Sequence, residues 1–379
     1  MKKNIAIDIR SLMSPNYSGV SFYTFFLIKN ILKKDNENNY FLFFNSFSKK
    51  YPDYIKELVK FPNTSIVHTK IPNKIFNFLQ KVFSFPKVDK LIFRKTKKKI
   101  DLILMPNINF LALGNTRLLV VIHDLSFLIF KEFFDWRRRL WHFFIDIKKL
   151  VKKSELIAVS KNTKRDIINY LEVSPDKINL IYPGLNKYED NSPNIELSNG
   201  FKIDERFILF FGNLEPRKNI ESIITAFEIF CEKFPQENYK LVLLGAKSWK
   251  FQSILRKYKN SVYKDRIIFL GYLKEDEKNQ ILKKASLVIF PSFYEGFGFP
   301  ILEAMHYGIP LICSSISSMG EVSNTASILI DPFNISDLLI AIENILFDND
   351  LRDSLIAKEK KEAEKFSWDK AVDEFLKLI

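Results

Sequence analysis

The chain has 379 residues, of which 47% are hydrophobic and 27% charged, and its net charge is +14. This length suits two domains of α/β size, and the composition excludes a collagen-like, disordered or repeat-array chain. No apolar run approaches the roughly 18 residues that span a bilayer, and Asp8 and Arg10 interrupt the N-terminal apolar stretch, so we expect neither a membrane-spanning segment nor a secretory signal.

Apolar runs that favour β-strands alternate along the chain with segments of helical periodicity. In the first half the runs are 4–10, 40–45, 65–69, 101–106, 117–125, 155–160 and 178–183. In the second half they are 206–214, 239–245, 266–271, 286–292, 310–315 and 327–332. The runs are continuously apolar rather than alternating, which is typical of parallel sheets covered on both faces by βαβ crossover helices.

The alternation is interrupted once, over residues 184–205, which are rich in Gly, Asn, Asp, Ser and Pro and have no apolar period. This composition is typical of a linker. The sequence therefore predicts an α/β fold with two Rossmann-like, doubly wound domains, 1–183 and 206–365. In such sheets ligands bind at the carboxyl ends of the strands.

Basic residues are concentrated in the first half. Residues 1–185 hold 33 Lys+Arg and 15 Asp+Glu, which leaves 25 and 29 for the rest of the chain. Two stretches are densest, 81–99 and 136–153, and in the second of them Trp, Phe and Leu are interspersed with Arg and Lys. Such segments suit an anionic membrane surface. Nucleic acid and a merely solvated lysine-rich face are the alternatives.

Cysteine usage and short motifs exclude several kinds of site. Cys231 and Cys313 lie in apolar stretches of different halves, which indicates buried, reduced thiols in a cytosolic protein. The chain has four histidines and no close Cys/His cluster, so we expect no metal site. The Asp-x-Asp motif Asp348-Asn349-Asp350 lies between two helical segments, where a turn and a helix N-cap explain it. Neither a phosphate-binding P-loop nor a serine nucleophile elbow is present.

The most informative segment is 286–315. A buried strand is followed by a loop with Gly296 and Gly298, and a helix then begins at Pro300 and ends at Gly308. The loop presents backbone amides and a helix N-terminus at the carboxyl edge of the sheet, which suits an anionic or hydroxyl-rich ligand.

Two carboxylates, Glu295 and Glu303, flank this loop, and each can accept hydrogen bonds from vicinal hydroxyls such as those of a sugar and a ribose. A solvated loop acid for Glu295 and a charge that offsets the dipole in the first helical turn for Glu303 are the alternatives.

A second candidate binding segment follows the strand that ends near Gly212. Asn219 is a good N-cap for the next helix, and Arg217 and Lys218 come immediately before it. Cations at a helix N-terminus oppose the macrodipole unless an anion binds there. Two cations and free backbone N–H groups predict a diphosphate site, with two exposed loop cations as the alternative.

The first domain supplies two smaller signals. His123 comes at the end of the run 117–125, where it is either a ligand contact or a structural hydrogen-bond donor or acceptor. Gly19 lies between the first strand and the first helix, where it either faces a phosphate or forms a turn.

These segments resemble a known family. FYEGFGFPILEAM contains the E-x7-E pattern (Glu295, Glu303) of retaining glycosyltransferases with the GT-B fold, the large family four, also called glycosyl transferases group 1. GNLEPRKNI, AVSKNTKRDI and IYPGL also resemble this family, and FSWDKAVDEFLKLI (366–379) resembles its closing helix, which crosses back to the first domain. The resemblance covers nearly the whole chain in order.

The resemblance implies that 1–183 faces the acceptor and that 206–365 binds a nucleotide-diphosphate sugar. Arg217 and Lys218 would bind the diphosphate, Glu303 the ribose and Glu295 the donor sugar. The amides near Phe297 and Gly298 would contact the sugar or the distal phosphate. His123 would lie over the sugar near the reacting carbon, and Gly19 and Gly212 would approach the donor. In this family the first-domain loop often has a glycine pair, whereas this chain has Ser18-Gly19.

The resemblance further implies a retaining, metal-independent transfer of a hexose, without a cofactor. VIHDLSF resembles mannosyltransferase-like members, which favours GDP-mannose as the donor; a UDP-sugar is the alternative. We expect a surface-glycan or lipid-linked acceptor in polysaccharide biosynthesis, with the enzyme peripherally bound to the cytoplasmic face of the membrane. A nucleic-acid-binding protein is the alternative from another class, and the acidic second half argues against nucleic acid as a partner.

Overall fold

The structure is a computed structural model that describes residues 2–13, 19–47, 51–136, 139, 145–185 and 205–379. The chain divides into two compact units. The first comprises 1–125, 136–186 and 366–379, and the second comprises 126–135 and 187–365.

The first unit is built on a parallel seven-stranded sheet in the order β3-β2-β1-β4-β5-β6-β7. Its strands are β1 (Asn4–Asp8), β2 (Asn39–Asn45), β3 (Thr64–Thr69), β4 (Leu102–Met105), β5 (Arg117–Ile122), β6 (Glu155–Ala158) and β7 (Ile178–Leu180). Its helices are η1 (Arg10–Met13), α1 (Gly19–Lys34), α2 (Asp53–Val59), α3 (Asn73–Val82), α4 (Val88–Thr96), α7 (Ile147–Lys152), α8 (Lys161–Leu171), η3 (Pro175–Lys177) and α16 (Trp368–Leu376).

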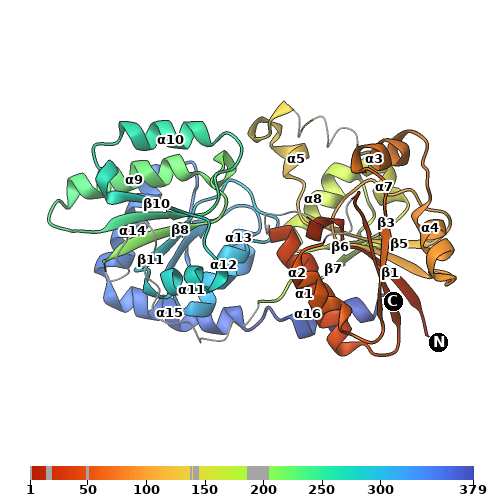
Figure 1. Cartoon of the computed structure of the whole chain (residues 1–379). Helices are drawn as coiled ribbons and strands as arrows, with labels where there is room; N and C mark the ends of the chain where they lie inside the picture. The colour runs from red at the N-terminus through yellow and green to blue at the C-terminus, as the bar shows by residue number, and fades with distance from the viewer. Residues whose placement is uncertain (1, 14–18, 48–50, 137–138, 140–144, 186–204) are drawn as a thin grey trace. The chain divides into compact units, whose positions relative to one another are not determined.

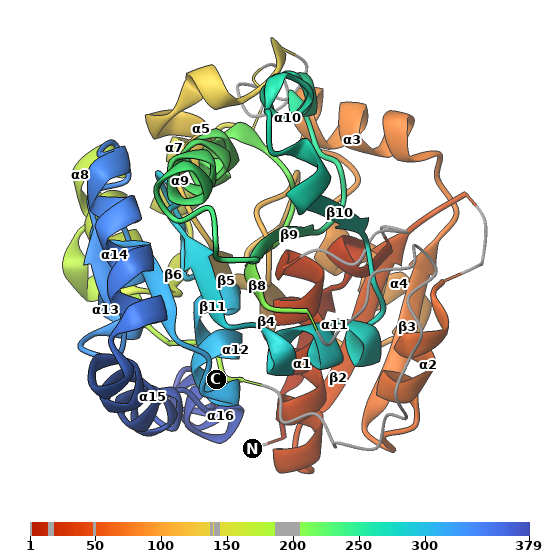
Figure 2. The same cartoon turned by 90° about the vertical axis from the view of Figure 1, so that its left-hand side faces the viewer.

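The second unit repeats this arrangement on a parallel six-stranded sheet in the order β10-β9-β8-β11-β12-β13. Its strands are β8 (Phe207–Phe211), β9 (Lys240–Leu244), β10 (Ile267–Gly271), β11 (Leu287–Phe290), β12 (Leu311–Ser314) and β13 (Ile328–Ile330). Its helices are α5 (Ser126–Ile129), η2 (Lys131–Phe133), η4 (Pro216–Lys218), α9 (Ile220–Lys233), α10 (Phe251–Asn260), η5 (Lys264–Arg266), α11 (Glu275–Lys284), α12 (Phe299–Tyr307), α13 (Met319–Ser323), α14 (Ile335–Phe347) and α15 (Asn349–Ala363). Figures 1 and 2 show α9 and α10 on one side of this sheet and α11 and α12 on the other.

The predicted fold class is confirmed, because each of the thirteen predicted strands is present in one of two doubly wound parallel sheets. Central strands such as β4, β8 and β11 are buried at every residue. Continuous burial requires cover on both faces of the sheet, which the crossover helices provide.

The boundary predicted for the first domain is wrong in one place. Residues 126–135 were expected within 1–183, but they pack with the second unit. The reason is a set of ring contacts that Phe130, Phe133 and Phe134 make with aromatic residues of the second unit.

The predicted linker begins too early. Leu185 donates a backbone hydrogen bond to Phe366, and a Cβ on Gly184 would lie 2.0 Å from the Trp368 nitrogen, so both residues pack against the start of α16. The remainder of the predicted linker, 186–204, lies outside the described residues. Helix α16 belongs to the first unit, where it packs on α1 and its Trp368 ring lies 5.6 Å from that of Tyr23.

Both cysteines are buried and unpaired, as expected. Burial raises the pKa of each thiol to about 11. Among the described residues, no helix has the length and apolar character to cross a membrane.

Candidate functional site

The predicted site of the second unit lies where its strand order reverses. Strands β8 and β11 are neighbours there, and their crossovers lead in opposite directions. In doubly wound sheets ligands bind at the carboxyl ends of the strands at such a reversal. The loop after β8 begins at Gly212, whose φ of +138° suits glycine. Gly245, at the end of β9, lies so close that a Cβ would come 1.8 Å from the Gly212 carbonyl oxygen. The absence of side chains at Gly212 and Gly245 therefore lets the loops after β8 and β9 pack closely together.

Helix η4 carries the two predicted cations. The Arg217 guanidinium forms an ion pair with Glu215 at 2.9 Å and with Glu295 at 3.0 Å. It also donates a hydrogen bond to the Tyr294 carbonyl, while the Phe293 amide donates to the Arg217 carbonyl at 2.9 Å. The loops after β8 and β11 are thus joined in both directions, and the Arg217 side chain is held between them.

Lys218 and Glu295 form a buried ion pair. The Lys218 Nζ atom also lies 4.8 Å from the centre of the Phe290 ring, a cation–π distance. Burial lowers the pKa of Lys218, against the opposing charge of Glu295. Burial raises the pKa of Glu295, but the charges of Arg217 and Lys218 outweigh it and hold the pKa below its ordinary value. Glu295 is therefore ionised at neutral pH.

The loop that leads into α12 is held by serines from the loop after β12. The Ser317 hydroxyl accepts from the Glu295 amide at 2.9 Å, and the Ser318 hydroxyl donates to the Phe297 carbonyl at 3.0 Å. Gly298 then caps α12 with a φ of +100°. A residue with a side chain would be strained at this φ, so the glycine fixes how the chain turns into the helix. The N-terminus of α12 is thereby placed at the carboxyl edge of β11, as predicted.

Glu303 lies on α12 beyond the first turn, so the reading that it offsets the dipole in that turn does not apply. It pairs with Lys278 of α11 at 2.9 Å, and both side chains are largely buried. Burial raises the pKa of Glu303 although the Lys278 charge opposes the shift. Burial lowers the pKa of Lys278, but Glu303 and Glu275 outweigh it and raise the pKa above its ordinary value. No spacing in the sequence links Lys278 to Glu303.

A strap formed by residues 126–135 packs on the same loops. The Phe130 ring lies 5.4 Å from that of Tyr294, and the Phe133 ring stacks on Phe293 at 5.7 Å. Trp249 donates to the Phe133 carbonyl at 2.7 Å and stacks on Phe134. Because Tyr294 also accepts from Arg217, the strap supports the loop that orients this cation.

Two predicted site residues, His123 and Gly19, belong to the first unit. His123 follows β5 directly, and its Nε2 lies 2.8 Å from the Pro106 carbonyl oxygen. A carbonyl only accepts, so Nε2 carries a hydrogen and the neutral ring has its acceptor at Nδ1. Burial lowers the pKa of His123, which favours this neutral form. Gly19 is the first residue of α1, and a Cβ there would meet no atom within 4 Å.

Comparison with known proteins identifies the family. The model for Glycosyltransferase Family 4 matches residues 17–187, and the model for Glycosyl transferases group 1 matches residues 191–362. The chain belongs to these glycosyltransferases. The predicted family and the GT-B fold are confirmed.

Individual relatives agree with this assignment. The chain is 32% identical to O-antigen chain mannosyltransferase B of Escherichia coli over 43% of its own length and 42% of that protein. It is 27% identical to the serotype-specific mannosyltransferase WbdA of Escherichia coli over 68% of its own length and 33% of that protein. The matches thus span less than half of these relatives. Sucrose-phosphate synthase of Thermosynechococcus elongatus has the same fold, with a TM-score of 0.74 at 18% identity over 100% of this chain and 98% of that one.

One detail of the glycosyltransferase site differs from the expectation. Asn219 precedes α9 as predicted, but its side chain makes no capping bond and instead donates to the Pro332 carbonyl at 2.7 Å. Its φ of +56° is the cause, because the preceding turn of η4 leaves Asn219 in the left-handed region. Asp348, from the Asp-x-Asp motif, caps α15 through a bond from the Leu351 amide at 2.9 Å, as expected.

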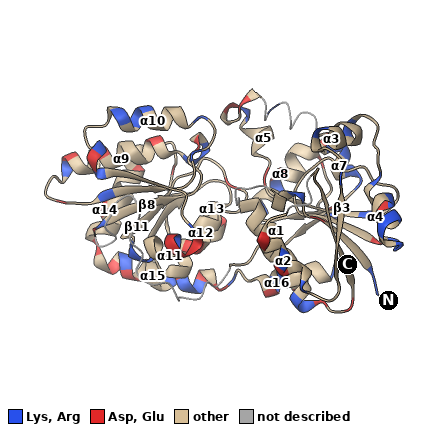
Figure 3. Ribbon diagram, in the orientation of Figure 1, with Lys and Arg blue, Asp and Glu red and all other residues tan. Residues whose placement is uncertain are grey.

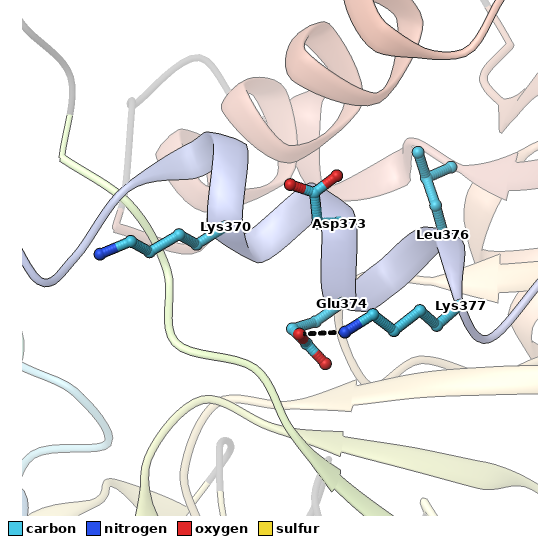
Figure 4. Close-up of a pocket in the computed structure, with 5 residues that line it drawn as sticks. All are labelled: Lys370, Asp373, Glu374, Leu376 and Lys377. Carbon is cyan, nitrogen blue, oxygen red and sulfur yellow. Dashed lines mark hydrogen bonds and ion pairs between the residues drawn. The ribbon is translucent and has the colours of Figure 1, made fainter.

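Within the described ranges, no group of three or more His, Cys, Asp and Glu side chains is arranged to hold a metal ion. A surface hollow of about 630 Å³ lies along α16 in the first unit (Figure 4). Its lining residues are Lys370, Asp373, Glu374, Leu376 and Lys377. None of the predicted site residues lines this hollow.

Proposed function

We propose that the chain is a retaining, metal-independent mannosyltransferase that uses GDP-mannose and acts at the cytoplasmic face of the membrane. The observation that carries the proposal is the convergence of Arg217, Lys218, Glu295 and the N-terminus of α12 at the reversal point of the second sheet. The mannosyltransferases of Escherichia coli that the chain resembles support mannose as the sugar.

In the proposed reaction, Arg217, Lys218 and the helix N-terminus stabilise the diphosphate. When the bond between the anomeric carbon and the phosphate oxygen breaks, its electron pair stays on the nucleotide diphosphate. Arg217 is already held by Glu215 and Tyr294, and Lys218 by Glu295. The loop before α12 is held by Ser317 and Ser318, so little reorganisation is needed as that charge develops. Preorganised donors of this kind commonly supply several kcal/mol of transition-state stabilisation.

The acceptor hydroxyl attacks the anomeric carbon from the side of the leaving group, and its proton passes to a phosphate oxygen. The products are the glycosylated acceptor, with retained configuration, and GDP. No enzymic nucleophile takes part in this scheme. The resemblance assigns Glu295 to the sugar hydroxyls, Glu303 to the ribose, and His123, as a neutral ring, to a contact with the sugar.

The acceptor in this proposal is a lipid-linked or surface glycan. The excess of positive charge in residues 1–185 supports an acceptor that is carried on an anionic membrane.

The test is thermal stability of the whole chain with GDP-mannose, GDP, UDP-glucose and UDP. A ligand at 100 times its Kd adds about 2.7 kcal/mol to the stability of the native state, which shifts the unfolding midpoint measurably. We expect stabilisation by GDP-mannose and GDP, and a loss of that stabilisation in Arg217→Lys and Glu303→Gln. Arg256→Ala, a change of an exposed arginine on α10, is the control that keeps it.

Stabilisation by the UDP compounds alone would overturn mannose and leave the donor site in place. If no nucleotide stabilises the wild type, the donor-site assignment itself is wrong. For His123→Ala we expect nucleotide stabilisation to persist and sugar transfer to fall; a loss of both would place the role of His123 in folding rather than in the reaction.

A further inference from the structure

Helix α3 and the turn after it carry a cluster of exposed apolar side chains, and α4 adds one more. Six large apolar residues are between 49% and 64% exposed there. They are Ile75, Phe78, Val82, Phe83, Phe85 and Phe93. Single exposed apolar residues need no explanation, but a cluster of this kind marks an interaction site.

The helix period separates this cluster from the core. Phe76 and Gln80, four residues apart, point into the unit and are buried. Ile75, Phe78 and Val82 have spacings of three and four residues and therefore form a second, outward stripe. Helix α3 is thus apolar on a face that its own unit leaves uncovered.

The cluster is built into the fold. The amides of Phe83 and Phe85 both donate to the Leu79 carbonyl, at 3.0 and 3.3 Å, which folds the turn back onto the helix. The Phe78 and Phe83 rings lie 6.2 Å apart, edge to face. The buried Gln80 amide bonds to the backbone at Pro86 and Ala112, so the turn is also tied to the unit below it.

Positive charge surrounds the cluster. Residues 70–99 contain ten Lys+Arg and a single acid, Asp89. The Asp89 carboxylate accepts from the Gly114 amide and the Thr116 hydroxyl, so it is engaged by the neighbouring loop. Figure 3 shows the Lys and Arg residues of α3 and α4 on this part of the first unit.

We propose that this apolar-basic face, residues 74–95, is the surface by which the protein docks on an anionic lipid membrane. The outward stripe of α3 and the Phe83–Phe85 turn enter the headgroup region, while the flanking lysines contact lipid phosphates. The inference rests on the proposed function, and it specifies the surface through which the enzyme reaches a membrane-linked acceptor.

Lipid fits this face better than nucleic acid or a second copy of the chain. Ile75 and Val82 have no aromatic face on which a base can stack, whereas aliphatic and aromatic side chains both enter the acyl boundary. Two copies of the face would bring together two surfaces with the same strong positive charge, which repel each other.

The inference predicts that α3, rather than the stretch 136–153, dominates membrane binding. We test it by co-sedimentation of the full chain with vesicles of phosphatidylglycerol and phosphatidylcholine, and with vesicles of phosphatidylcholine alone. The variant Ile75→Glu/Phe78→Glu replaces two side chains that are 52% and 57% exposed. Ile340→Glu, on α14 of the second unit and 55% exposed, is the matched control.

We expect the wild type and Ile340→Glu to bind the anionic vesicles, and the double variant to bind at least about tenfold more weakly. Equal binding by the double variant would overturn the inference, as would failure of the wild type to bind. Stronger binding to duplex DNA than to the vesicles, or self-association that the double variant abolishes, would assign the face to another partner.

Nucleotide stabilisation separates this inference from the proposed function. It is measured on the same preparations without lipid, and we expect the double variant to respond to GDP-mannose like the wild type. A folded variant that keeps the nucleotide response but loses the vesicles supports the docking face. A wild type that binds vesicles through α3 but responds to no nucleotide leaves the docking face in place and refutes the donor assignment.

Discussion

Glu359 offers a sharp test of the packing behind the site. It lies on α15, which packs against α12, the helix that carries Glu303. The Glu359 side chain is fully buried, and within the described part of the chain no cation pairs with it. Burial raises the pKa of Glu359 to about 9. At neutral pH this carboxyl is therefore protonated in the folded protein and ionised in the unfolded chain.

The sign of the pH dependence follows from this shift. Below the ordinary pKa of 4.5 both states hold the proton, so stability is fully present. As the pH rises toward 9 the unfolded chain releases the proton and stability is progressively lost. Each pH unit in that window costs about 1.4 kcal/mol, so between pH 5 and pH 8 the wild type should lose about 4 kcal/mol relative to a variant that cannot ionise.

The perturbation is Glu359→Gln, and the assay is urea unfolding of the wild type and the variant at pH 5 and pH 8. We expect the unfolding free energy of the variant, relative to that of the wild type, to rise by about 4 kcal/mol between pH 5 and pH 8. Glu364→Gln, a change of an exposed acid at the end of the same helix, is the control and should show no such trend. A difference between Glu359→Gln and the wild type that is the same at both pH values would refute the reasoning.

Two further perturbations test the site's framework. Lys278→Met should destabilise the protein by about 3–5 kcal/mol, because it leaves Glu303 buried without its cation. The double variant Lys278→Met/Glu303→Leu should recover part of that loss. If a double-mutant cycle shows that the losses of the two single variants add, the pairing is contradicted. Gly245→Ala should cost at least about 3 kcal/mol and lower the unfolding midpoint, because the new Cβ meets the Gly212 carbonyl. Gly19→Ala, where no atom lies within 4 Å, should leave the midpoint unchanged, and equal effects at the two glycines would show that the contact does not matter.

The fold could be predicted from the sequence because strands buried in a doubly wound sheet appear as short, continuously apolar runs. Runs such as FILFF and LVIF can be covered on both faces only between two layers of helices, and they appear as strands β8 and β11. The end of α12 was equally local, because Gly308 takes the left-handed conformation that closes a helix. Arg217, Lys218, Glu295 and Glu303 were predicted as site residues because they follow or flank the ends of strands, and the structure brings the first three of them together.

The partners of these residues were not accessible from the sequence. Lys278 meets Glu303 only because α11 and α12 pack side by side, and Ser317 reaches Glu295 only because β11 and β12 are neighbours. The side chain of Asn219 turns away from its helix because η4 fixes its backbone. The strap 126–135 joins the second unit through ring contacts with residues more than 100 positions away.

The sequence by itself determined the two sheets, the family and the charged residues near the ends of β8 and β11, because each depends on patterns within about ten to twenty residues. Among the described residues, the tertiary structure decided which charges are paired, which apolar side chains of α3 face outward, and that Glu359 is buried without a cation. Those features depend on the elements that pack beside each residue. Helix periodicity shows that α3 has more than one apolar face, but only the packed unit shows which of them is covered.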